Sequence, residues 1–264
     1  MIESQDFGEE IIHVIPLGFE ADRAIKPFEK YRANRVYLLA LLESTKYSRA
    51  MLERQKHYLN LVTSKLRSLG IEVKYINTDT FNLLEVMGTI ARIIREEKSR
   101  KNRVFVNMSA AGRLTSFGAA LAAMHQGARV YYVVADDYSK TPEELLEHGI
   151  SICRELRIQF IENLKLLFPD ERAQKVLAWL CKAEKGKKTA EIIGFLREQR
   201  IQGFEEEYDK MKRNKKSNYL MKLNKGILEK LENEGYITRE RLGKNNIIKI
   251  TDSGRYIAYL SGLI

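Results

Sequence analysis

The sequence is poor in cysteine, proline and tryptophan and has no long apolar run. Its 264 residues include two cysteines, four prolines and one tryptophan. Cys153 and Cys181 lie far apart and fit no zinc or thioredoxin spacing, which excludes a disulfide scaffold, a zinc finger and a redox pair. No apolar stretch reaches the roughly 18 to 20 residues that a membrane span needs. These absences indicate a protein that folds around ordinary apolar cores.

The beginning of the sequence lacks the features of a targeting signal. Glu3 and Asp6 lie where a signal peptide would be basic and then apolar. With 44% hydrophobic and 30% charged residues, the composition is that of a folded, soluble protein. We therefore expect a cytoplasmic location, with no membrane partner, no metal site and no cofactor.

Positive charge is concentrated near the C-terminus. The chain has 45 Lys and Arg against 35 Asp and Glu, a formal net charge of +10. Residues 1–169 contain 24 basic and 21 acidic side chains, a net +3, whereas residues 210–255 contain 13 and 5, a net +8. A segment the size of one small domain therefore has most of the field that attracts a polyanion such as nucleic acid.

Residues 10–134 alternate between short apolar runs and longer amphipathic stretches, which predicts a parallel sheet covered by helices. The runs are rich in β-branched residues, and we interpret each as a strand buried on both faces: Ile11–Ile15, Val36–Ala40, Val73–Ile76, Val104–Val106 and Val130–Ala135. The helices between them are expected near residues 21–31, 48–69, 82–98 and 112–126. The predicted fold class is α/β, with a doubly wound, Rossmann-like unit of five or six strands.

The length of the chain favours two domains. A short helix is expected to begin after Thr141, and residues 150–168 fit either a last strand or a connector. We expect a Rossmann-like domain over residues 1–150, a connector over residues 151–169 and a smaller domain over residues 170–264.

The smaller domain reads as three helices followed by two short strands. Asp170 is a candidate N-cap for the first helix, and the second helix follows Thr189. The third is expected over Ser217–Glu234, with Gly235 ending it. The strands, near residues 236–242 and 247–251, are joined by four residues of hairpin-turn chemistry, Gly243, Lys244, Asn245 and Asn246. This order of elements is that of a winged helix-turn-helix.

The third predicted helix has the features of a DNA-recognition helix. Its buried stripe is Leu220, Leu223, Ile227 and Leu231, and its basic side chains cluster toward the N-terminal end, which enters the major groove. The candidate phosphate contacts are Lys215, Lys216, Ser217 and Tyr219; the candidate base contacts are Asn218, Lys222 and Lys225; the candidate wing contacts are Arg239, Arg241 and Lys244. The alternative is an ordinary solvated basic face.

Two polar loops follow strands that a doubly wound sheet would place side by side. In the order 3-2-1-4-5 the first and fourth strands are neighbours, and ligands bind at their carboxyl ends. Gly18 and Gly112 allow the backbone to approach a ligand closely. Ser109, Thr115 and the free N–H groups of the helix that begins near Gly112 are suited to an anion. The alternative is that the glycines only satisfy the turn geometry.

Other signals are weaker. Neither a P-loop nor a G-x-G-x-x-G sequence occurs, which argues against an NTPase and an NAD enzyme. A carboxylate at Glu20 would repel phosphate, so we expect Glu20 to pair with Arg23 or to bind a ribose or base. His13 is interpreted as a core histidine, and Asp136 and Asp137 as solvated loop carboxylates.

Several segments resemble archaeal transcriptional regulators that join a CARF (CRISPR-associated Rossmann fold) domain to a winged helix. These are His13–Glu20, Asp22–Phe28, Val106–Arg113, Lys222–Lys225, Gly235–Ile237, Leu242–Lys244 and Thr251–Arg255. The resemblance implies a homodimer of Rossmann domains with a pocket built from both loops of both subunits, which senses cyclic oligoadenylate in related CRISPR regulators. It further implies, by matching position, that the ligand-binding residues are Pro16, Leu17, Gly18, Phe19 and Glu20 in the first loop and Asn107, Ser109, Ala110, Gly112 and Arg113 in the second.

We therefore expect a ligand-responsive transcriptional regulator that binds double-stranded DNA as a homodimer, with half-sites about 34 Å apart. Two alternatives remain open. One is an enzyme, a ring nuclease in which Ser109, Arg113 or Lys26 helps a ribose 2′-hydroxyl of cyclic oligoadenylate to attack in line. The other is a regulator of metabolism whose pocket takes another nucleotide or a small metabolite. No catalytic residue is expected in a regulator.

Overall fold

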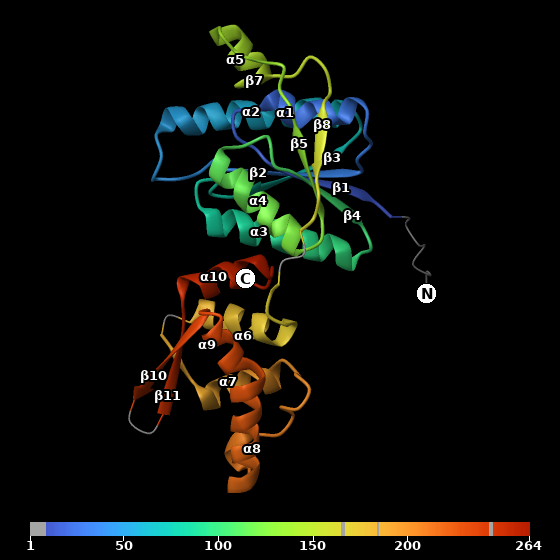
Figure 1. Cartoon of the computed structure of the whole chain (residues 1–264). Helices are drawn as coiled ribbons and strands as arrows, with labels where there is room; N and C mark the ends of the chain where they lie inside the picture. Colours follow the sequence, from blue (N-terminus) through green and yellow to red (C-terminus); the bar gives the residue numbers. More distant parts are fainter. Residues whose placement is uncertain (1–8, 165–166, 184, 243–244) are drawn as a thin grey trace, which may run out of the picture. The chain divides into compact units, whose positions relative to one another are not determined.

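The apolar runs of the N-terminal half form a six-stranded sheet in the computed structural model of the chain (Figure 1). The structure describes residues 9–164, 167–183, 185–242 and 245–264. The sheet has the strand order β3-β2-β1-β4-β5-β8. Its strands are β1 (Ile11–Pro16), β2 (Arg35–Ala40), β3 (Glu72–Asn77), β4 (Arg103–Asn107), β5 (Arg129–Val133) and β8 (Ile158–Ile161). The predicted α/β class and the neighbouring positions of β1 and β4 are confirmed.

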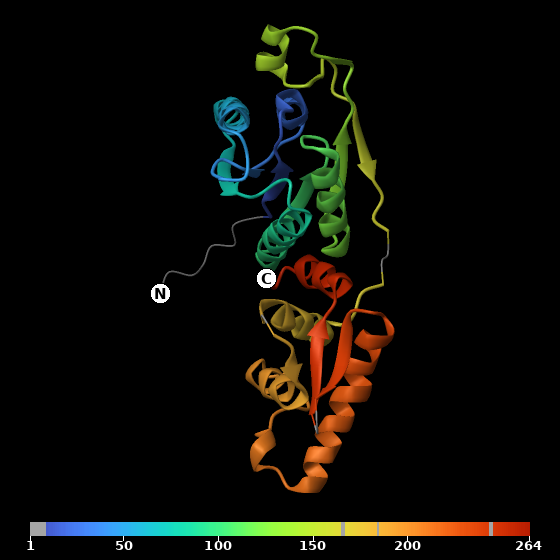
Figure 2. The same ribbon diagram turned by 90° about the vertical axis from the view of Figure 1, so that its left-hand side faces the viewer.

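Helices cover both faces of this sheet (Figures 1 and 2). On one face lie α1 (Ala21–Ile25), the 3₁₀ helix η1 (Lys26–Glu29) and α2 (Arg49–Ser68); on the other lie α3 (Leu83–Ser99) and α4 (Arg113–His125). The helix starts follow the capping chemistry of the sequence, because the Ser48 side chain accepts a hydrogen bond from the Met51 amide and Asn82 does the same for Glu85. The sheet is therefore the middle of three layers.

Two strands differ from the prediction. β3 was expected to be buried on both faces, but none of its residues is buried, because β3 is an edge strand. β8 is antiparallel to β5, whereas β1 to β5 are parallel. Residues 158–161, in the expected connector, therefore belong to the sheet, and the first of two compact units extends over residues 1–166.

A small excursion leaves the sheet after β5. It contains β6 (Asp137–Tyr138), α5 (Pro142–His148) and β7 (Ser151–Ile152), with β6 and β7 paired. Thr141 and Glu144 form a reciprocal capping box at the start of α5. Gly149, which follows α5, has a φ of +87° and directs the chain back toward β1.

The second unit, residues 167–264, has the predicted order of a winged helix. Its elements are α6 (Glu171–Lys182), β9 (Lys187–Lys188), α7 (Thr189–Glu198), the 3₁₀ turn η2 (Tyr208–Lys210), α8 (Arg213–Leu223), the π-helical turn η3 (Asn224–Leu228), α9 (Glu229–Asn233), β10 (Ile237–Leu242), β11 (Asn245–Ile250) and α10 (Asp252–Leu260). β10, β11 and β9 form an antiparallel sheet. Asp170 caps α6 as predicted, accepting a hydrogen bond of 3.0 Å from the Ala173 amide.

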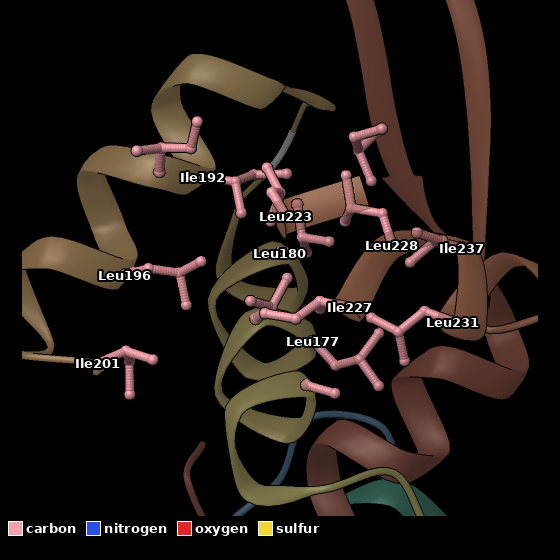
Figure 3. Close-up of a cluster of buried hydrophobic side chains, with 14 of the residues drawn as sticks. Leu177, Leu180, Ile192, Leu196, Ile201, Leu223, Ile227, Leu228, Leu231 and Ile237 are labelled. Atoms are coloured by element: carbon pink, nitrogen blue, oxygen red, sulfur yellow. The ribbon is translucent and has the colours of Figure 1, made fainter. Parts of the chain in front are cut away.

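The helix expected over residues 217–234 is longer and less regular than predicted. It begins at Arg213 and passes through η3 into α9. The apolar residues of its buried stripe meet α6 and α7 in one core (Figure 3). Leu223, Ile227 and Leu231 are almost fully buried, as is Leu228, whereas Leu220 is only partly buried. Packing therefore fixes the C-terminal half of the helix and leaves most of its N-terminal half in solvent.

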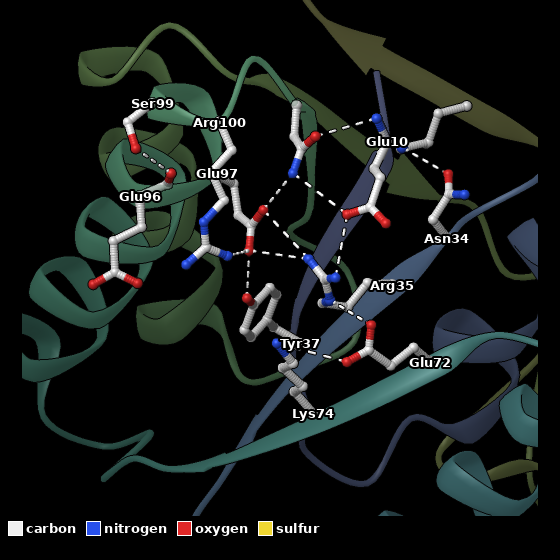
Figure 4. Close-up of polar contacts among 12 residues, drawn as sticks. Glu10, Asn34, Arg35, Tyr37, Glu72, Lys74, Glu96, Glu97, Ser99 and Arg100 are labelled. Atoms are coloured by element: carbon white, nitrogen blue, oxygen red, sulfur yellow. Dashed lines mark hydrogen bonds and ion pairs between the residues drawn. The ribbon is translucent and has the colours of Figure 1, made fainter. Parts of the chain in front are cut away.

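A network of charged groups joins the strands of the first unit around Glu97 (Figure 4). The Glu97 carboxylate accepts hydrogen bonds from Tyr37 (2.5 Å) and Asn102 (2.6 Å) and pairs with Arg35 at 3.3 Å. Arg35 also pairs with Glu72, at 2.6 Å. Burial alone would raise the pKa of Glu97, but these hydrogen bonds and the charge of Arg35 together lower it. The hydrogen bond from Arg35 lowers the pKa of Glu72.

Replacing Glu97 is expected to reduce stability in a pH-dependent way. Glu97→Gln removes a buried charge and leaves its partners poorly satisfied, so we expect a loss of about 1–3 kcal/mol at neutral pH. Because the folded pKa is lowered, the stabilisation is complete above the unfolded pKa and is lost as the pH falls through the folded pKa. Urea denaturation followed by circular dichroism should show the wild-type advantage shrinking toward acid pH. Fluorescence of Trp179, in the second unit, should be unaffected; a pH-independent difference would contradict this account.

Candidate functional site

A cavity of ≈ 900 Å³ lies at the carboxyl ends of β1, β4 and β5, where sequence analysis placed a ligand. Six segments contribute to it: the loops after β1 and β4 with the helix starts that follow them, the loop after β3, α2, the end of β5 and the excursion that follows β5. Its lining residues are Gly18, Phe19, Glu20, Arg23, Gln55, Thr80, Phe81, Met108, Ser109, Ala111, Gly112, Arg113, Leu114, Thr115, Ser116, Phe117, Tyr132, Tyr138 and Ile150. Ligand pockets commonly have volumes of about 300–1,000 Å³, so this cavity is large enough for a nucleotide-sized group.

The two predicted loops do meet. The Gly18 amide donates a hydrogen bond of 2.7 Å to the Ala110 carbonyl. A Cβ at position 18 would lie 3.3 Å from Ala111 Cα, so Gly18 allows the loops to approach each other. Asn107 Nδ2 donates to the Arg23 carbonyl at 2.9 Å, which ties β4 to α1.

The structure divides the predicted ligand residues into two groups. Gly18, Phe19, Glu20, Ser109, Gly112 and Arg113 line the cavity. Pro16, Leu17, Asn107 and Ala110 are buried and do not line it. The second group supports the loops from below, because their side chains are enclosed in the fold.

The hydroxyl groups predicted to bind an anion already have partners. Ser109 donates to Asn107 Oδ1 at 2.6 Å and accepts from the Val133 amide at 3.0 Å. Thr115 donates to the Thr80 carbonyl. The first amides of α4 remain available, because Gly112 caps this 13-residue helix without a side-chain hydrogen bond. Backbone N–H groups rather than hydroxyls therefore suit an anion here.

Glu20 fastens the excursion to the loop after β1. Its carboxylate accepts hydrogen bonds from the Ser151 amide (3.0 Å) and hydroxyl (3.1 Å), and lies 3.9 Å from Arg23. Burial raises its pKa, and the charge of Arg23 and the hydrogen bonds from Ser151 oppose that shift. The expected pairing with Arg23 is thus present, but the stronger contacts are with Ser151.

Two arginines place positive charge in the lining of the cavity. Arg23 is buried; it donates to the Ser109 carbonyl at 3.2 Å and lies 5.1 Å from the centre of the Tyr132 ring. Its Nε has no hydrogen-bond partner among the described residues. Arg113, at the start of α4, is exposed and lines the same cavity. Arg23 and Arg113 together outweigh the single carboxylate of Glu20.

Sequence reasoning missed the apolar rim of the cavity. Phe81, Leu114, Phe117, Tyr138 and Ile150 are each between 45% and 60% exposed, and all five line the cavity. Large apolar side chains gathered on a surface are typical of an interaction site. The available signal was the position of these residues beside the polar loops, but only the fold shows that they gather.

In the winged helix unit, several predicted DNA contacts are engaged within the protein. Lys215 pairs with Glu206 at 3.1 Å. Lys222 Nζ donates to the Gly203 carbonyl at 3.3 Å and lies 5.6 Å from the centre of the Phe204 ring. The Tyr219 hydroxyl accepts a hydrogen bond from the Glu206 amide, and the Lys216 ammonium lies over the Tyr208 ring. These contacts fasten the loop after α7 to the exposed half of α8.

Arg239 is the wing residue whose position differs most from its predicted role. Its Nη1 donates to Asn224 Oδ1 at 3.0 Å, its Nε lies 2.8 Å from Glu232 Oε2, and its side chain is only 17% exposed. The side chain therefore joins β10 to the helix. Lys244, also predicted in the wing, lies outside the described residues.

Four predicted DNA contacts remain available. Ser217, Asn218, Lys225 and Arg241 are exposed, and within the described ranges their side chains make no hydrogen bond or ion pair. Ser217, Asn218 and Lys225 belong to α8 and η3, and Arg241 to β10. The helix and the wing thus both present free polar groups.

The described part of the chain contains neither a metal-binding cluster nor a helix suited to a membrane. No group of three His, Cys, Asp or Glu side chains is arranged to hold a metal ion there. None of the helices described combines the length and apolar character needed to cross a bilayer.

Gly149→Ala is expected to disturb the wall of the cavity. A Cβ there would lie 2.4 Å from the Phe19 carbonyl oxygen and 2.7 Å from the Ala21 nitrogen. The backbone conformation alone costs alanine about 1–3 kcal/mol. Gly70→Ala is the matched control, since its φ is +78° but no atom lies within 4 Å of its Cβ. Thermal denaturation should show the larger loss for Gly149→Ala; equal losses would contradict the close contact.

Three solved structures with limited similarity to this chain are bound to a cyclic oligonucleotide or activated by one. Enterococcus italicus Csm6 bound to cyclic hexa-2′-fluoro-hexa-dAMP is 14% identical, with a TM-score of 0.43 over 87% of this chain and 57% of that chain. Can2 from Sulfobacillus thermosulfidooxidans in complex with cyclic tetra-adenylate is 14% identical, with a TM-score of 0.37 over 94% and 61%. A type III CRISPR defence DNA nuclease activated by cyclic oligoadenylate is 20% identical, with a TM-score of 0.39 over 49% and 19%. This chain spans less than two thirds of each of these proteins.

Family models match both halves of the sequence. The N-terminal domain family HFX_2341_N matches residues 11–138. The family described as "DUF6293 C-terminal winged helix domain" matches residues 172–262. No curated protein matches the sequence. The first match covers most of the sheet unit and the second covers most of the winged helix unit, so each half of the chain is similar to a known domain family.

Proposed function

We propose that the protein is a homodimeric transcriptional regulator that binds double-stranded DNA through its winged helix and a nucleotide-type effector, such as cyclic oligoadenylate, through its CARF-like domain. The observation that carries the proposal is the set of exposed, unengaged side chains Asn218, Lys225 and Arg241 on the helix and wing of a winged helix domain. The segment that contains them has a net charge of +8.

These side chains match the two kinds of contact that duplex binding needs. Amide groups such as that of Asn218 read the edge of adenine in the major groove, whereas Lys and Arg contact phosphates or guanine. Arg239 holds the wing to the helix through Asn224 and Glu232. Arg241, two residues further along β10, therefore extends from a wing that is fixed relative to the helix.

The cavity of the first unit supports an anionic ligand with aromatic groups. Arg113 and the first amides of α4 suit phosphate, and Arg23 adds a buried positive charge. Phe19, Phe81 and Tyr132 offer ring faces or edges in the same cavity, on which bases stack favourably. Together with the resemblance of the two loops to CARF regulators, this chemistry favours a cyclic oligoadenylate.

The apolar rim supports the dimer. Phe81, Leu114, Phe117, Tyr138 and Ile150 surround the cavity and expose about half of their surface. A cyclic oligonucleotide is larger than the ligands that one cavity of this volume encloses. Two copies joined at this rim would bury the apolar side chains and let both cavities face one ligand.

The alternatives have less support. Of the three residues suggested for a ring nuclease, Ser109 is committed to Asn107 and Val133, and Lys26 pairs with Glu29 at 2.9 Å. Only Arg113 lines the cavity without such a partner among the described residues. A regulator that responds to another metabolite would have the same DNA-binding unit. The ligand-binding experiment below distinguishes it from a cyclic oligoadenylate receptor.

The salt dependence of DNA binding tests the interface. Lys225→Gln and Arg241→Gln should each weaken binding to a mixed-sequence duplex and lower the slope of log K against log salt by about 0.9, the value of one phosphate contact. Lys65→Gln, an exposed lysine on α2, is the matched control and should change neither. Fluorescence anisotropy across a salt series provides the measurement. Unchanged slopes in both variants would remove the proposed interface.

Ligand binding tests the cavity. Cyclic tetra-adenylate at 100 times its dissociation constant should stabilise the first unit by about 2.7 kcal/mol. Arg113→Gln should abolish the shift, whereas Arg49→Gln, whose side chain is 92% exposed on α2, should retain it. Chromatography of the same mixture separates a receptor from a ring nuclease, which would release linear products. A shift with another nucleotide alone would favour the metabolic regulator.

A further inference from the structure

A second, smaller cavity lies on the opposite side of the first unit from the loops described above. Its volume is ≈ 190 Å³, and it is lined by Ile11, His13, Pro27, Tyr31, Arg32, Arg103, Phe105, Tyr131, Ile158 and Phe160. The lining comes from the beginning of β1 and β4, from β5 and β8, and from η1 and the residues that follow it. An engineered protein cavity of about 150 Å³ admits benzene, so this one has room for a single substituted ring.

His13 brings a polar atom into this apolar surface. The side chain is almost fully buried, and burial lowers its pKa to about 3, so the ring is neutral. Its Nδ1 lies 3.0 Å from the Tyr131 hydroxyl, and the ring stacks on Phe105 with 5.2 Å between ring centres. His13 Nε2 makes no hydrogen bond within the described residues, yet it is not enclosed. Because the ring lines the cavity, solvent reaches Nε2 through that cavity.

The two nitrogens of the His13 ring have different surroundings. Nδ1 shares its hydrogen bond with the Tyr131 hydroxyl, and Nε2 is the nitrogen without a partner among the described residues. In a neutral ring one nitrogen donates and the other accepts, so Nε2 can form one hydrogen bond with a hydroxyl group, which is able to do either. The cavity thus contains one unused hydrogen-bonding group in an apolar lining.

Two exposed arginines complete the lining. Arg32 and Arg103 belong to different segments, before β2 and at the start of β4. Arg103 pairs with Glu9 at 3.6 Å, in solvent, and its guanidinium lies 5.9 Å from the centre of the Phe105 ring. Their positive charge lies where the cavity opens, because both are exposed and the remaining lining is largely apolar.

We propose that this cavity is a second ligand site, for a small planar aromatic carboxylate with a hydroxyl group on the other side of its ring. The ring would contact Phe105, Phe160 and Tyr31, the hydroxyl would form a hydrogen bond with His13 Nε2, and the carboxylate would lie between Arg32 and Arg103. The site is separate from the larger cavity and does not depend on the effector or DNA proposed above.

Isothermal titration of the full chain with 4-hydroxybenzoate tests the site. Benzoate, which lacks the hydroxyl, and 4-hydroxybenzamide, which lacks the charge, should each bind about tenfold more weakly, the equivalent of 1.4 kcal/mol. Equal binding of all three compounds, or no binding of 4-hydroxybenzoate, would overturn the proposal.

Variants locate the binding. His13→Phe keeps a ring but removes the hydrogen-bonding nitrogen and should weaken 4-hydroxybenzoate binding about tenfold, while benzoate binding stays nearly the same. Ile158→Trp fills the cavity from β8 and should abolish binding of 4-hydroxybenzoate and of benzoate. Leu69→Ala, the control, is not among the lining residues and should leave the binding of both compounds unchanged. If His13→Phe fails to fold by circular dichroism, ¹⁵N-histidine spectra of the wild type decide: the Nε2 signal must move on titration, and an unmoved signal rejects the site.

Discussion

The structure of the first unit depends on the meeting of two loops at the carboxyl ends of β1 and β4. The hydrogen bond from the Gly18 amide to the Ala110 carbonyl, at 2.7 Å, joins segments that are about ninety residues apart. Each parallel strand is followed by a helix that crosses over the sheet. The helix after β1 lies on one face and the helix after β4 lies on the other, so a crevice opens between the two loops. Asn107 and Ser109 use their polar groups to hold the crevice from below, which leaves backbone amides and Arg113 to face a ligand.

The sequence was sufficient for the parts of the fold that periodicity and capping specify. β1, β2, β4 and β5 are apolar runs buried on one or both faces, and Asp170 marks the start of α6 with its own side chain. β8 was ambiguous because its four residues are only partly buried, an edge strand whose pairing is decided by β5. The extension of α8 back to Arg213 was missed because its first turns are entirely polar and leave no hydrophobic pattern to read.

In the candidate site, too, some features could be predicted from the sequence and others depend on contacts that only the fold creates. The two glycine-containing loops were predicted because topology alone brings them together. Glu20 could not be assigned to Ser151, since 131 residues separate them and the contact depends on the path through Gly149. Arg239 was predicted as a DNA contact, yet Glu232 and Asn224 take up its guanidinium, and Asn224 lies in a π-helical turn that no helical wheel anticipates. Charge counts predict an interface, but pairing within the fold decides which charges remain available.

The proposed effect of a ligand on DNA binding would have a route through strand pairing in this architecture. Tyr132 lines the large cavity from β5, and β8, the strand paired with β5, is the last element before the winged helix unit. β8 is antiparallel and pairs with one neighbour only, so it is held less firmly than the central strands. A ligand shifts an equilibrium only by the difference between its affinities for the two states. An effector at the cavity would therefore act through an arrangement of β5 and β8 that changes the position of Tyr132.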